Sequence, residues 1–456
     1  MLKEDKNLSK YINKKINVNN VNTFYKVAKT NNLSSLAESS LKYIEHQFPM
    51  VVKKQNFLNS DFSFVSKILG SSELNIHSEV EVFIAASAWL KHNSAERSKF
   101  AKRLLLKIRL ALLSEPALTY LLGCNSPFTQ INECVKVLKE ALCCKKHLAQ
   151  NNAGNCCTRR YCTQNEFNLL ICGGINSRLR AEECKVVRST KKIEGGNFKK
   201  VKALAPMNKG RCDFEAVCLK GDVYVFGGRN NDYNFVKTVE KYSLSANKWN
   251  IVARLPDDRD KFCACAFMDK IFIIGAYYEE NYHETTASCL QFDTTQKTWT
   301  GDSWKEVCGM NGARHYAACA VFRGSVVAAG GLNYRRLNTV ESYDVFGDSW
   351  TPMPGMITGK CYHTLVAAKD KLFVIDCGNC EVFDNVCKRF VAFKSPYNIQ
   401  INQAVSVGNK IVIIKVTNSH EYLSVCYDLD KDEWSEKSCV VADDFDCFST
   451  VKLPLC

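Results

Sequence analysis

The sequence of 456 residues predicts a multidomain chain: a bundle of α-helices, followed by an all-β propeller of six blades. Apolar residues recur at helical spacing in the first third of the chain, whereas short apolar strands alternate with turns from residue 166 onward. In the second part, one aromatic follows another by seven positions five times, in the pairs Tyr242/Trp249, Phe292/Trp299, Tyr343/Trp350, Phe383/Phe390 and Tyr427/Trp434. Such a repeat is typical of a propeller.

Local signals define the helices of the first part. Apolar residues are spaced by three and four positions in the segments 33–44 and 82–90. Ser78 and Glu81 have the spacing of a capping box ahead of the second segment, and Pro116 fits the first turn of a further helix. An all-α bundle is therefore expected.

The positive charge of the chain is concentrated in the same part. Residues 1–165 carry 24 Lys and Arg against 12 Asp and Glu, whereas the remainder carries 37 against 35. These cations are scattered at helix-surface spacing, which is typical of a solvated face and not of a nucleic-acid site. No run of about 18 apolar residues and no apolar signal sequence occur, so we expect a cytoplasmic protein without membrane contact.

Cysteine is frequent, with 24 residues, but the chain is too long and too apolar for a disulfide scaffold. We expect reduced, mostly structural thiols. One cluster deserves a test as a zinc site: Cys143, Cys144, His147, Cys156, Cys157 and Cys162. Adjacent Cys-Cys pairs do not have the two-to-four-residue spacing of zinc ligands. The sequence therefore predicts a helical, cysteine-rich linker over residues 123–165, without metal.

The propeller units share one order of elements: an apolar strand, a second strand that ends in glycine, a loop, a strand with the first aromatic, and a strand with the second. Gly227–Gly228 and Gly330–Gly331 are the best glycine pairs, and glycine there allows close approach or positive φ. The tail Phe445–Pro454 resembles a first strand, so we expect it to return to unit one and close the ring. The predicted units are 166–210, 211–258, 259–312, 313–358, 359–401 and 402–456.

These units resemble the kelch repeat. The resemblance rests on the double glycines, on Val239-Glu240-Lys241-Tyr242 and Val340-Glu341-Ser342-Tyr343, and on the following Trp249 and Trp350. Three copies are strong and three have lost parts of the pattern. The regularity of units five and six is left open.

Residues 18–122 resemble the BACK domain of the BTB-BACK-kelch proteins, through Leu41–Phe48, Glu79–His92 and Ile108–Ser114. The resemblance implies a non-catalytic adaptor of a cullin-3 ubiquitin ligase, whose propeller binds the protein to be ubiquitinated and degraded by the proteasome. A whole BTB domain does not fit into residues 1–17, which match at most its last helix, so the BTB domain is expected to be missing or truncated. An actin-binding scaffold, or an interaction module without cullin, is the alternative.

A partner-binding face can be predicted from the repeat. Arg211, Arg259, Arg314 and Lys360 each precede the first strand of a unit in the same register, so we expect a ring of cations on one face. Loops after the second strands should contribute to that face Asn176, Arg178, Arg180, Arg229, Asn231, Tyr233, Tyr277, Tyr278, Tyr334 and Arg335. Cations beside tyrosines favour an acidic, partly apolar peptide.

Catalysis is not expected. The propeller contains four histidines, His283, His315, His363 and His420, one in each of four units. His315 and His363 lie at strand starts beside Arg314 and Lys360, without the carboxylate or thiolate spacing of a metal or acid–base site. The sequence therefore predicts no catalytic residue, no metal and no cofactor, in contrast to the copper oxidases that also contain kelch repeats.

Overall fold

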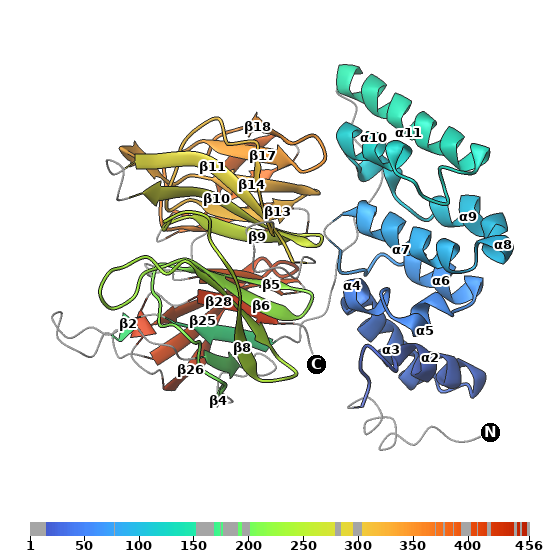
Figure 1. Cartoon of the computed structure of the whole chain (residues 1–456), viewed down its shortest axis with the longest axis horizontal. Coiled ribbons are helices and arrows are strands. Elements are labelled where there is room, and N and C mark those ends of the chain that lie inside the picture. The colour runs from blue at the N-terminus through green and yellow to red at the C-terminus, as the bar shows by residue number, and fades with distance from the viewer. Residues whose placement is uncertain are drawn as a thin grey trace. The chain divides into compact units, whose positions relative to one another are not determined.

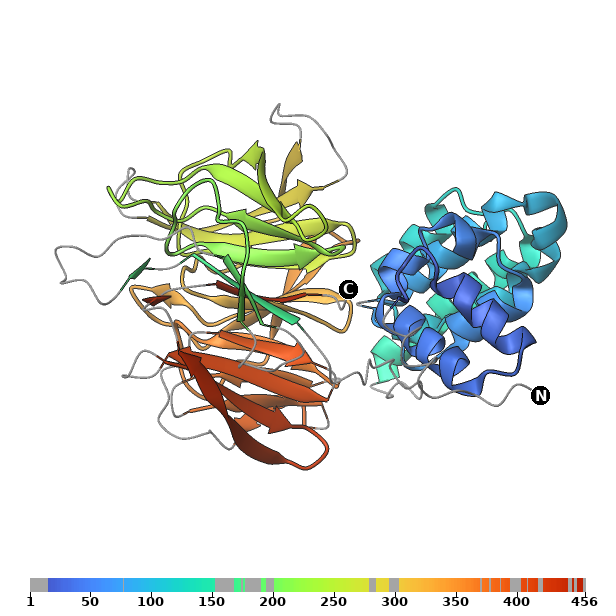
Figure 2. The ribbon, with the colours of Figure 1, turned by 90° about the horizontal axis from the view of Figure 1, so that it is seen from below.

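The computed structural model divides the chain into two compact units, which meet in the sequence between Thr163 and Gln164. Figures 1 and 2 show the first unit as helices and the second as β-sheets. A helical N-terminal part followed by a β-propeller is thus confirmed. The residues described are 15–76, 78–151, 168–173, 175–176, 190–193, 201–278, 284–294, 303–369, 371–376, 379–385, 387–393, 403–407, 409–416, 421–441, 445–446 and 449–453.

The described part of the first unit contains only helices. Of these, none is both long and apolar enough to cross a membrane. The helices are α2 (Val21–Thr30), α3 (Ser34–His46), α4 (Phe48–Val51), α5 (Gln55–Leu58), α6 (Phe62–Gly70), α7 (Glu79–His92), α8 (Ser94–Arg97), η1 (Ser98–Phe100), α9 (Ala101–Leu105), η2 (Leu110–Leu112), α10 (Glu115–Gly123) and α11 (Asn132–Asn151).

Helix α7 begins where the sequence predicts. The Ser78 hydroxyl accepts a hydrogen bond from the Val80 amide (3.3 Å), and the Glu81 carboxylate accepts one from the Ser78 amide (3.2 Å). Ser114 caps α10, with Pro116 in its first turn. The predicted capping box and the predicted place of Pro116 are therefore confirmed.

Five four-stranded antiparallel sheets, called blades two to six, are each built from one continuous stretch of the described chain. Blade two is β5–β8 (Glu215–Leu219, Asp222–Phe226, Thr238–Ser243, Lys248–Arg254), and blade three is β9–β12 (Cys263–Phe267, Lys270–Tyr278, Glu284–Asp293, Trp304–Val307). Blades four to six are β13, β14, β17 and β18 (Ala318–Phe322, Ser325–Ala329, Val340–Asp344, Ser349–Met353), β19–β22 (Thr364–Ala368, Lys371–Ile375, Glu381–Asp384, Arg389–Ala392) and β23–β26 (Gln403–Val407, Lys410–Val416, Glu421–Asp428, Glu433–Val441).

A further sheet combines strands from both ends of the propeller. Its order is β28 (Ser449–Leu453), β1 (Asn168–Cys172), β3 (Thr190–Ile193) and β4 (Val201–Ala203), and Figures 1 and 2 show red β28 beside the green strands. A short pair joins β2 (Ile175–Asn176) to β27 (Phe445–Asp446). The return of the tail to unit one is therefore confirmed. Where the sequence predicts six units, the described chain shows five blades of continuous sequence, because the first unit lacks an innermost strand of its own.

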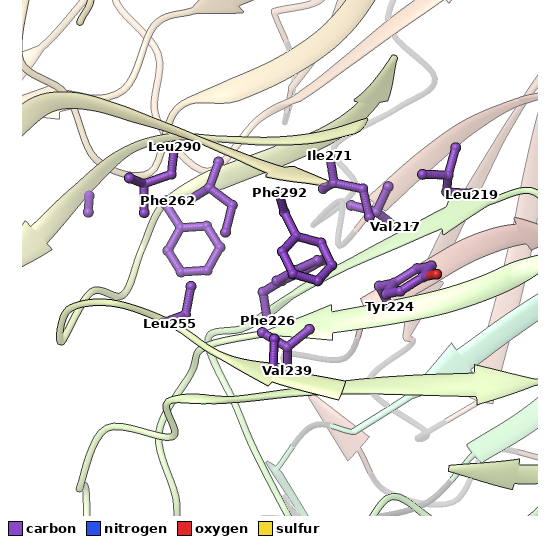
Figure 3. Packing of buried hydrophobic residues seen from close by; sticks show 13 residues of the cluster. Val217, Leu219, Tyr224, Phe226, Val239, Leu255, Phe262, Ile271, Leu290 and Phe292 are labelled. Carbon is purple, nitrogen blue, oxygen red and sulfur yellow. The ribbon is translucent and has the colours of Figure 1, made fainter. Parts of the chain in front are cut away.

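Apolar clusters join successive sheets. Figure 3 shows the cluster between blades two and three, in which Phe226 and Phe292 lie against each other with ring centroids 5.8 Å apart. Corresponding clusters join blades three and four, blades four and five, and blades five and six. Each sheet therefore buries its apolar faces only by packing on its neighbours, as expected for repeat architectures.

The aromatic pairs lie opposite each other on neighbouring strands, with one correction. Tyr242 pairs with Trp249 in register, and Tyr343 with Trp350, as the seven-residue spacing predicts. In blade three, however, Phe292 pairs with Trp304 (centroids 4.8 Å apart), and the predicted Trp299 lies outside the described residues. The loop of blade three is longer, so the spacing misidentified the tryptophan of this blade.

The glycine pairs have the predicted cause. Gly227 has φ +63°, and an added Cβ would lie 2.7 Å from the ring of Phe262 in the next blade. Gly330 has φ +61°, and its Cβ would lie 2.6 Å from the ring of His363. Any side chain here would therefore collide with the following blade.

Candidate functional site

Buried ion pairs hold the loops of the propeller in place. In blade two, Arg211 is fully buried, and its Nη2 donates to Glu240 Oε1 over 2.7 Å. Glu240 also accepts from the backbone amides of Asn208 (2.7 Å) and Lys209 (3.0 Å), and Arg211 donates to the Gly227 carbonyl (3.0 Å). One network therefore fixes the segment that enters the blade and the glycine that ends its second strand.

Blades four and five repeat this arrangement. Arg314 donates to Glu341 (2.5 Å), and the Lys360 ammonium lies 3.2 Å from Glu381. Glu341 accepts from the Asn311 amide over 2.7 Å, as Glu240 does from Asn208. Each glutamate stands two residues before the first aromatic of its blade.

Blade three also pairs its buried arginine with a carboxylate, but with other residues. Leu290 occupies the position that glutamate has in the neighbouring blades. Arg259 instead pairs with Asp257, and it donates to the Tyr278 hydroxyl over 2.8 Å. Burial raises the pKa of Tyr278 to about 12, so its hydroxyl keeps the proton that it donates to Asp257 (3.0 Å).

The four predicted ring cations therefore lie beneath the face that they were expected to line. The exposed fractions of Arg211, Arg259, Arg314 and Lys360 are 0%, 2%, 1% and 2%. Arginine or lysine recurs at this position because its side chain binds carbonyl and carboxylate groups inside the blade. This structural role explains the shared register from which a cation ring was predicted. A partner can reach only the surface above these side chains.

Residues two positions after each buried cation form that surface. They are Asp213, Lys261, Tyr316 and Tyr362, called the rim below, and all four have left-handed backbone, with φ of 51°, 55°, 49° and 57°. Such a conformation costs a non-glycine residue about 1–2 kcal/mol. The Tyr316 amide donates to the Lys261 carbonyl (2.7 Å) and the Tyr362 amide to the Tyr316 carbonyl (3.2 Å), so the backbone is tied from blade to blade.

The rim presents aromatic rings next to a cation. Tyr316 and Tyr362 have ring centroids 3.9 Å apart, and Tyr362 is 63% exposed. The Lys261 ammonium lies 4.4 Å from the ring centroid of Tyr277 and 5.4 Å from that of Tyr316. Among the described residues, Lys261 has no ion pair within 4 Å.

Two loops with predicted contact residues rise beside the rim. Backbone bridges between Cys212 and Arg229 and between His315 and Leu332 join the loops to the segments that carry the rim. Tyr334 is fully exposed at the tip of the hairpin β15–β16 (Leu332–Asn333, Arg335–Arg336). The other exposed members of the predicted set are Asn231, Tyr233 and Arg335.

Other predicted contact residues are less accessible or not described. Arg229 is buried and pairs with Asp260 over 2.6 Å. Tyr277 and Tyr278 are half-buried. Only the backbone of Asn176 is described, in β2, and Arg178 and Arg180 lie outside the described residues.

The sequence prediction missed the rim residues, although a signal was present. Each follows a predicted cation at the same distance, in Arg-Cys-Asp213, Arg-Asp-Lys261, Arg-His-Tyr316 and Lys-Cys-Tyr362. The side chains differ in charge and size, so residue type alone does not identify the position. What these residues share is their backbone conformation, which only the structure shows.

His315 lies between the buried Arg314 and the rim residue Tyr316 in the sequence. His315 Nδ1 lies 2.9 Å from Thr285 Oγ1, and burial, helped by the charge of Lys261, lowers the pKa of His315, which favours the neutral ring. Within the described residues, no three His, Cys, Asp or Glu are arranged to hold a metal ion. Cys143 and Cys144 are exposed on α11, and the rest of the predicted cysteine cluster falls on residues whose side chains are not described.

Comparison with family models matches both units. The model "BACK: BTB And C-terminal Kelch" matches residues 21–122. The model "KLHDC2/KLHL20/DRC7 Kelch-repeats domain" matches residues 160–378. The two matches occur in the order that the sequence predicts.

Curated relatives give the same result. Kelch repeat and BTB domain-containing protein 12 of Homo sapiens is 22% identical over 81% of this chain and 70% of the relative. Kelch-like protein 7 of Rattus norvegicus is 25% identical over 73% of this chain, and Kelch-like protein 28 of Mus musculus is 24% identical over 67%. The chain spans about half the length of the last two, 54% and 44%.

Proposed function

Because this chain belongs to the kelch-like family, with a BACK domain followed by kelch repeats, we propose that it is a non-catalytic subunit that recruits a target protein to a cullin-3 ubiquitin ligase. In this proposal the propeller binds the target, which is then ubiquitinated and degraded by the proteasome. The BACK unit is proposed to help connect the propeller to the ligase.

The rim is the observation that supports this proposal most directly. Buried ion pairs in three blades and their substitute in blade three fix the loop backbone, and the residues above them are two tyrosines, a lysine and an aspartate, all exposed or half-buried. Tyrosine side chains on rigid backbone are typical of protein-binding surfaces. An acidic, partly apolar peptide of the target is the proposed ligand.

The proposal includes a propeller of six blades, in which the sheet of β28, β1, β3 and β4 is the first. The innermost strands β5, β9, β13, β19 and β23 contact one another in order, and β28 contacts both β23 and β5. Closure of this kind removes exposed sheet edges and makes the rim a rigid platform.

A cytoplasmic location is part of the same proposal. The cysteines that the structure describes are free thiols, among them buried Cys263 and Cys265 in the innermost strand of blade three. Burial raises the pKa of Cys289 to about 12, which makes this thiol unreactive. Free thiols in this number are in keeping with a reducing compartment.

An actin-binding scaffold, or an interaction module without cullin, is the second candidate. The kelch repeats matched in residues 160–378 are the part of the chain that such a scaffold or module would use.

Affinity capture of the full chain from cell extract, with quantitative mass spectrometry, separates these functions. The adaptor proposal expects cullin-3 with the wild-type chain and with a rim variant, Tyr362→Ala, and expects target proteins with the wild type alone. A matched control is Lys248→Ala, since Lys248 is exposed on β8 of the propeller and is not part of the rim. Recovery of actin without cullin-3 would support the second candidate, and recovery of neither would contradict both.

A further inference from the structure

Lys261 stands apart from the other cations around the rim. The buried cations beneath the rim and beside it each have a carboxylate partner, in the pairs Arg211/Glu240, Arg259/Asp257, Arg314/Glu341, Lys360/Glu381 and Arg229/Asp260. Lys261 forms no ion pair in the described part of the chain, although Asp260 is its neighbour in sequence. One positive charge on the rim therefore has no ion pair among the described residues, and the buried Asp260, which Arg229 holds, acts on it only at longer range.

The position of this ammonium group is set by rings and not by an acid. Its Nζ lies 4.4 Å from the centroid of Tyr277 and 5.4 Å from that of Tyr316, and the side chain is half-buried. Contact with ring faces removes water from one side of the ammonium and leaves its other donors available. A carboxylate from outside would gain a partly desolvated partner that is already in place.

Next to this charge lies a pair of packed aromatic rings. Tyr316 and Tyr362 pack with centroids 3.9 Å apart, and Tyr362 is 63% exposed. Ring faces of this kind bind proline side chains, and a proline-containing segment is already extended, so it loses little conformational entropy on binding. The left-handed backbone of both tyrosines, tied by the Tyr362 amide to the Tyr316 carbonyl, makes the surface rigid.

The rim also limits the charge of its ligand. Asp213, the exposed rim residue of blade two, places a negative charge near Tyr316, where it adds to burial in raising the pKa of that hydroxyl. A run of acidic residues would meet repulsion there. One carboxylate next to an apolar ring fits better than an acidic stretch.

We propose that the rim binds an extended peptide that presents a single carboxylate to Lys261 and a proline ring to the Tyr316–Tyr362 pair. This proposal rests on the proposed function and names the ligand of the same surface. An extended chain advances about 3.3 Å per residue. Because Nζ of Lys261 lies 5.4 Å from the Tyr316 centroid, the acid and the proline belong within two or three residues of each other.

Selection of a random peptide library on phage, with the full chain as bait, tests the proposal. The wild-type chain is expected to enrich peptides with Asp or Glu two or three residues from proline. Lys261→Glu should exchange the acid for Lys or Arg, and Tyr362→Ala should lose the proline. Matched controls are Lys248→Glu, exposed on β8, and Tyr120→Ala on α10, which should select the same peptides as the wild type.

Affinity for a synthetic peptide of the selected sequence completes the test. Lys261→Glu should weaken binding about tenfold or more, and Lys261→Met should weaken it less, because methionine removes the charge without reversing it. Thermal unfolding of each variant shows whether it is folded, and Lys261→Met replaces Lys261→Glu if the latter is not.

Three results would overturn the inference: no enriched peptide with the wild type, enriched peptides without an acid, or the same peptides with wild type and Lys261→Glu. The proposed function has a separate readout, since cullin-3 capture does not involve the rim. Failure of the peptide test with intact capture of cullin-3 and of rim-dependent targets would leave the adaptor role standing and reject only this ligand.

Discussion

Blades two and three are neighbours with the same strand order, yet they hold their buried arginine with different residues. In blade two the carboxylate comes from Glu240 on the third strand, whereas in blade three Leu290 stands at that position and Asp257 provides the carboxylate from the loop before the blade. The requirement is thus a partner for the buried guanidinium, and not a glutamate at one position.

The tryptophans of blades two and three likewise make the same contact from different sequence positions. Trp249 follows Tyr242 by seven positions, whereas Trp304 follows Phe292 by twelve. Each indole nevertheless donates a hydrogen bond to a backbone carbonyl at the end of the preceding sheet: Trp249 to Ala205 (2.9 Å) and Trp304 to Arg254 (2.7 Å). The contact in space is kept while the spacing in the sequence changes. A sequence repeat therefore indicates the fold more reliably than it identifies the residue.

The largest effect should come from breaking the ion pair of blade two. Glu240→Ala leaves Arg211 buried without its carboxylate, so we expect a loss of about 3–5 kcal/mol in the free energy of unfolding. Urea denaturation followed by tryptophan fluorescence measures it. Glu433→Ala, at an exposed position on β26, is the matched control and should be neutral. Equal effects of the two changes would contradict the structural role of the pair.

Replacement of the blade-three tryptophan should have the next largest effect. Trp304→Ala removes a half-buried ring and its hydrogen bond to the Arg254 carbonyl, with an expected loss of about 2–3 kcal/mol. The same denaturation experiment on Trp299→Ala distinguishes the two assignments. A larger loss with Trp299→Ala would restore the seven-residue spacing and reject the pairing of Phe292 with Trp304.

The contribution of blade five to the stability of the protein is expected to depend on pH. His363 stands three residues after Lys360, where blade three has Phe262, and burial lowers its pKa from 6.5 to about 3. Below pH 6.5 the unfolded chain binds a proton that folded His363 does not, so stability is lost as the pH falls toward 3, by up to about 1.4 kcal/mol per pH unit.

His363→Phe should remove this contribution. The variant is expected to lose less stability than the wild type between pH 7 and pH 5, as measured by urea denaturation at both values. The comparison of two chains cancels the carboxylates that titrate in both. Parallel pH profiles would show that His363 is protonated without cost in the folded state, contrary to its burial.

The smallest effect is expected for the substitute pair of blade three. Asp257→Ala leaves the buried Arg259 without its carboxylate, but Asp257 itself is 36% exposed, so water can take its place, and the Tyr278 hydroxyl still accepts from Arg259. We therefore expect a cost of about 1–2 kcal/mol, less than that of Glu240→Ala. Denaturation of both variants under the same conditions is the measurement. A cost equal to that of Glu240→Ala would mean that the exposure of Asp257 does not weaken the ion pair of blade three relative to that of blade two.

Much of the fold could be predicted because it depends on local patterns. The capping box of Ser78 and Glu81, the first-turn Pro116, the glycine pairs and the returning tail all rest on short spacings or on strand periodicity. The candidate site was harder to predict. The shared position before the first strand of each unit predicted correctly where Arg211 and Arg314 lie in the blade, but it predicted wrongly that they are exposed. The sequence position of an arginine does not show that a carboxylate of another strand will lie close enough to bury it.

By itself the sequence determined a helical unit before a propeller and the family to which the chain belongs, because hydrophobic period and turn residues act over a few positions. Only the tertiary structure decided that the predicted cations are buried, that Trp304 is the partner of Phe292, and that Lys261, Tyr316 and Tyr362 share a surface. These properties arise where blades meet, between residues that lie tens of positions apart, and they depend on which buried charge each blade must neutralise.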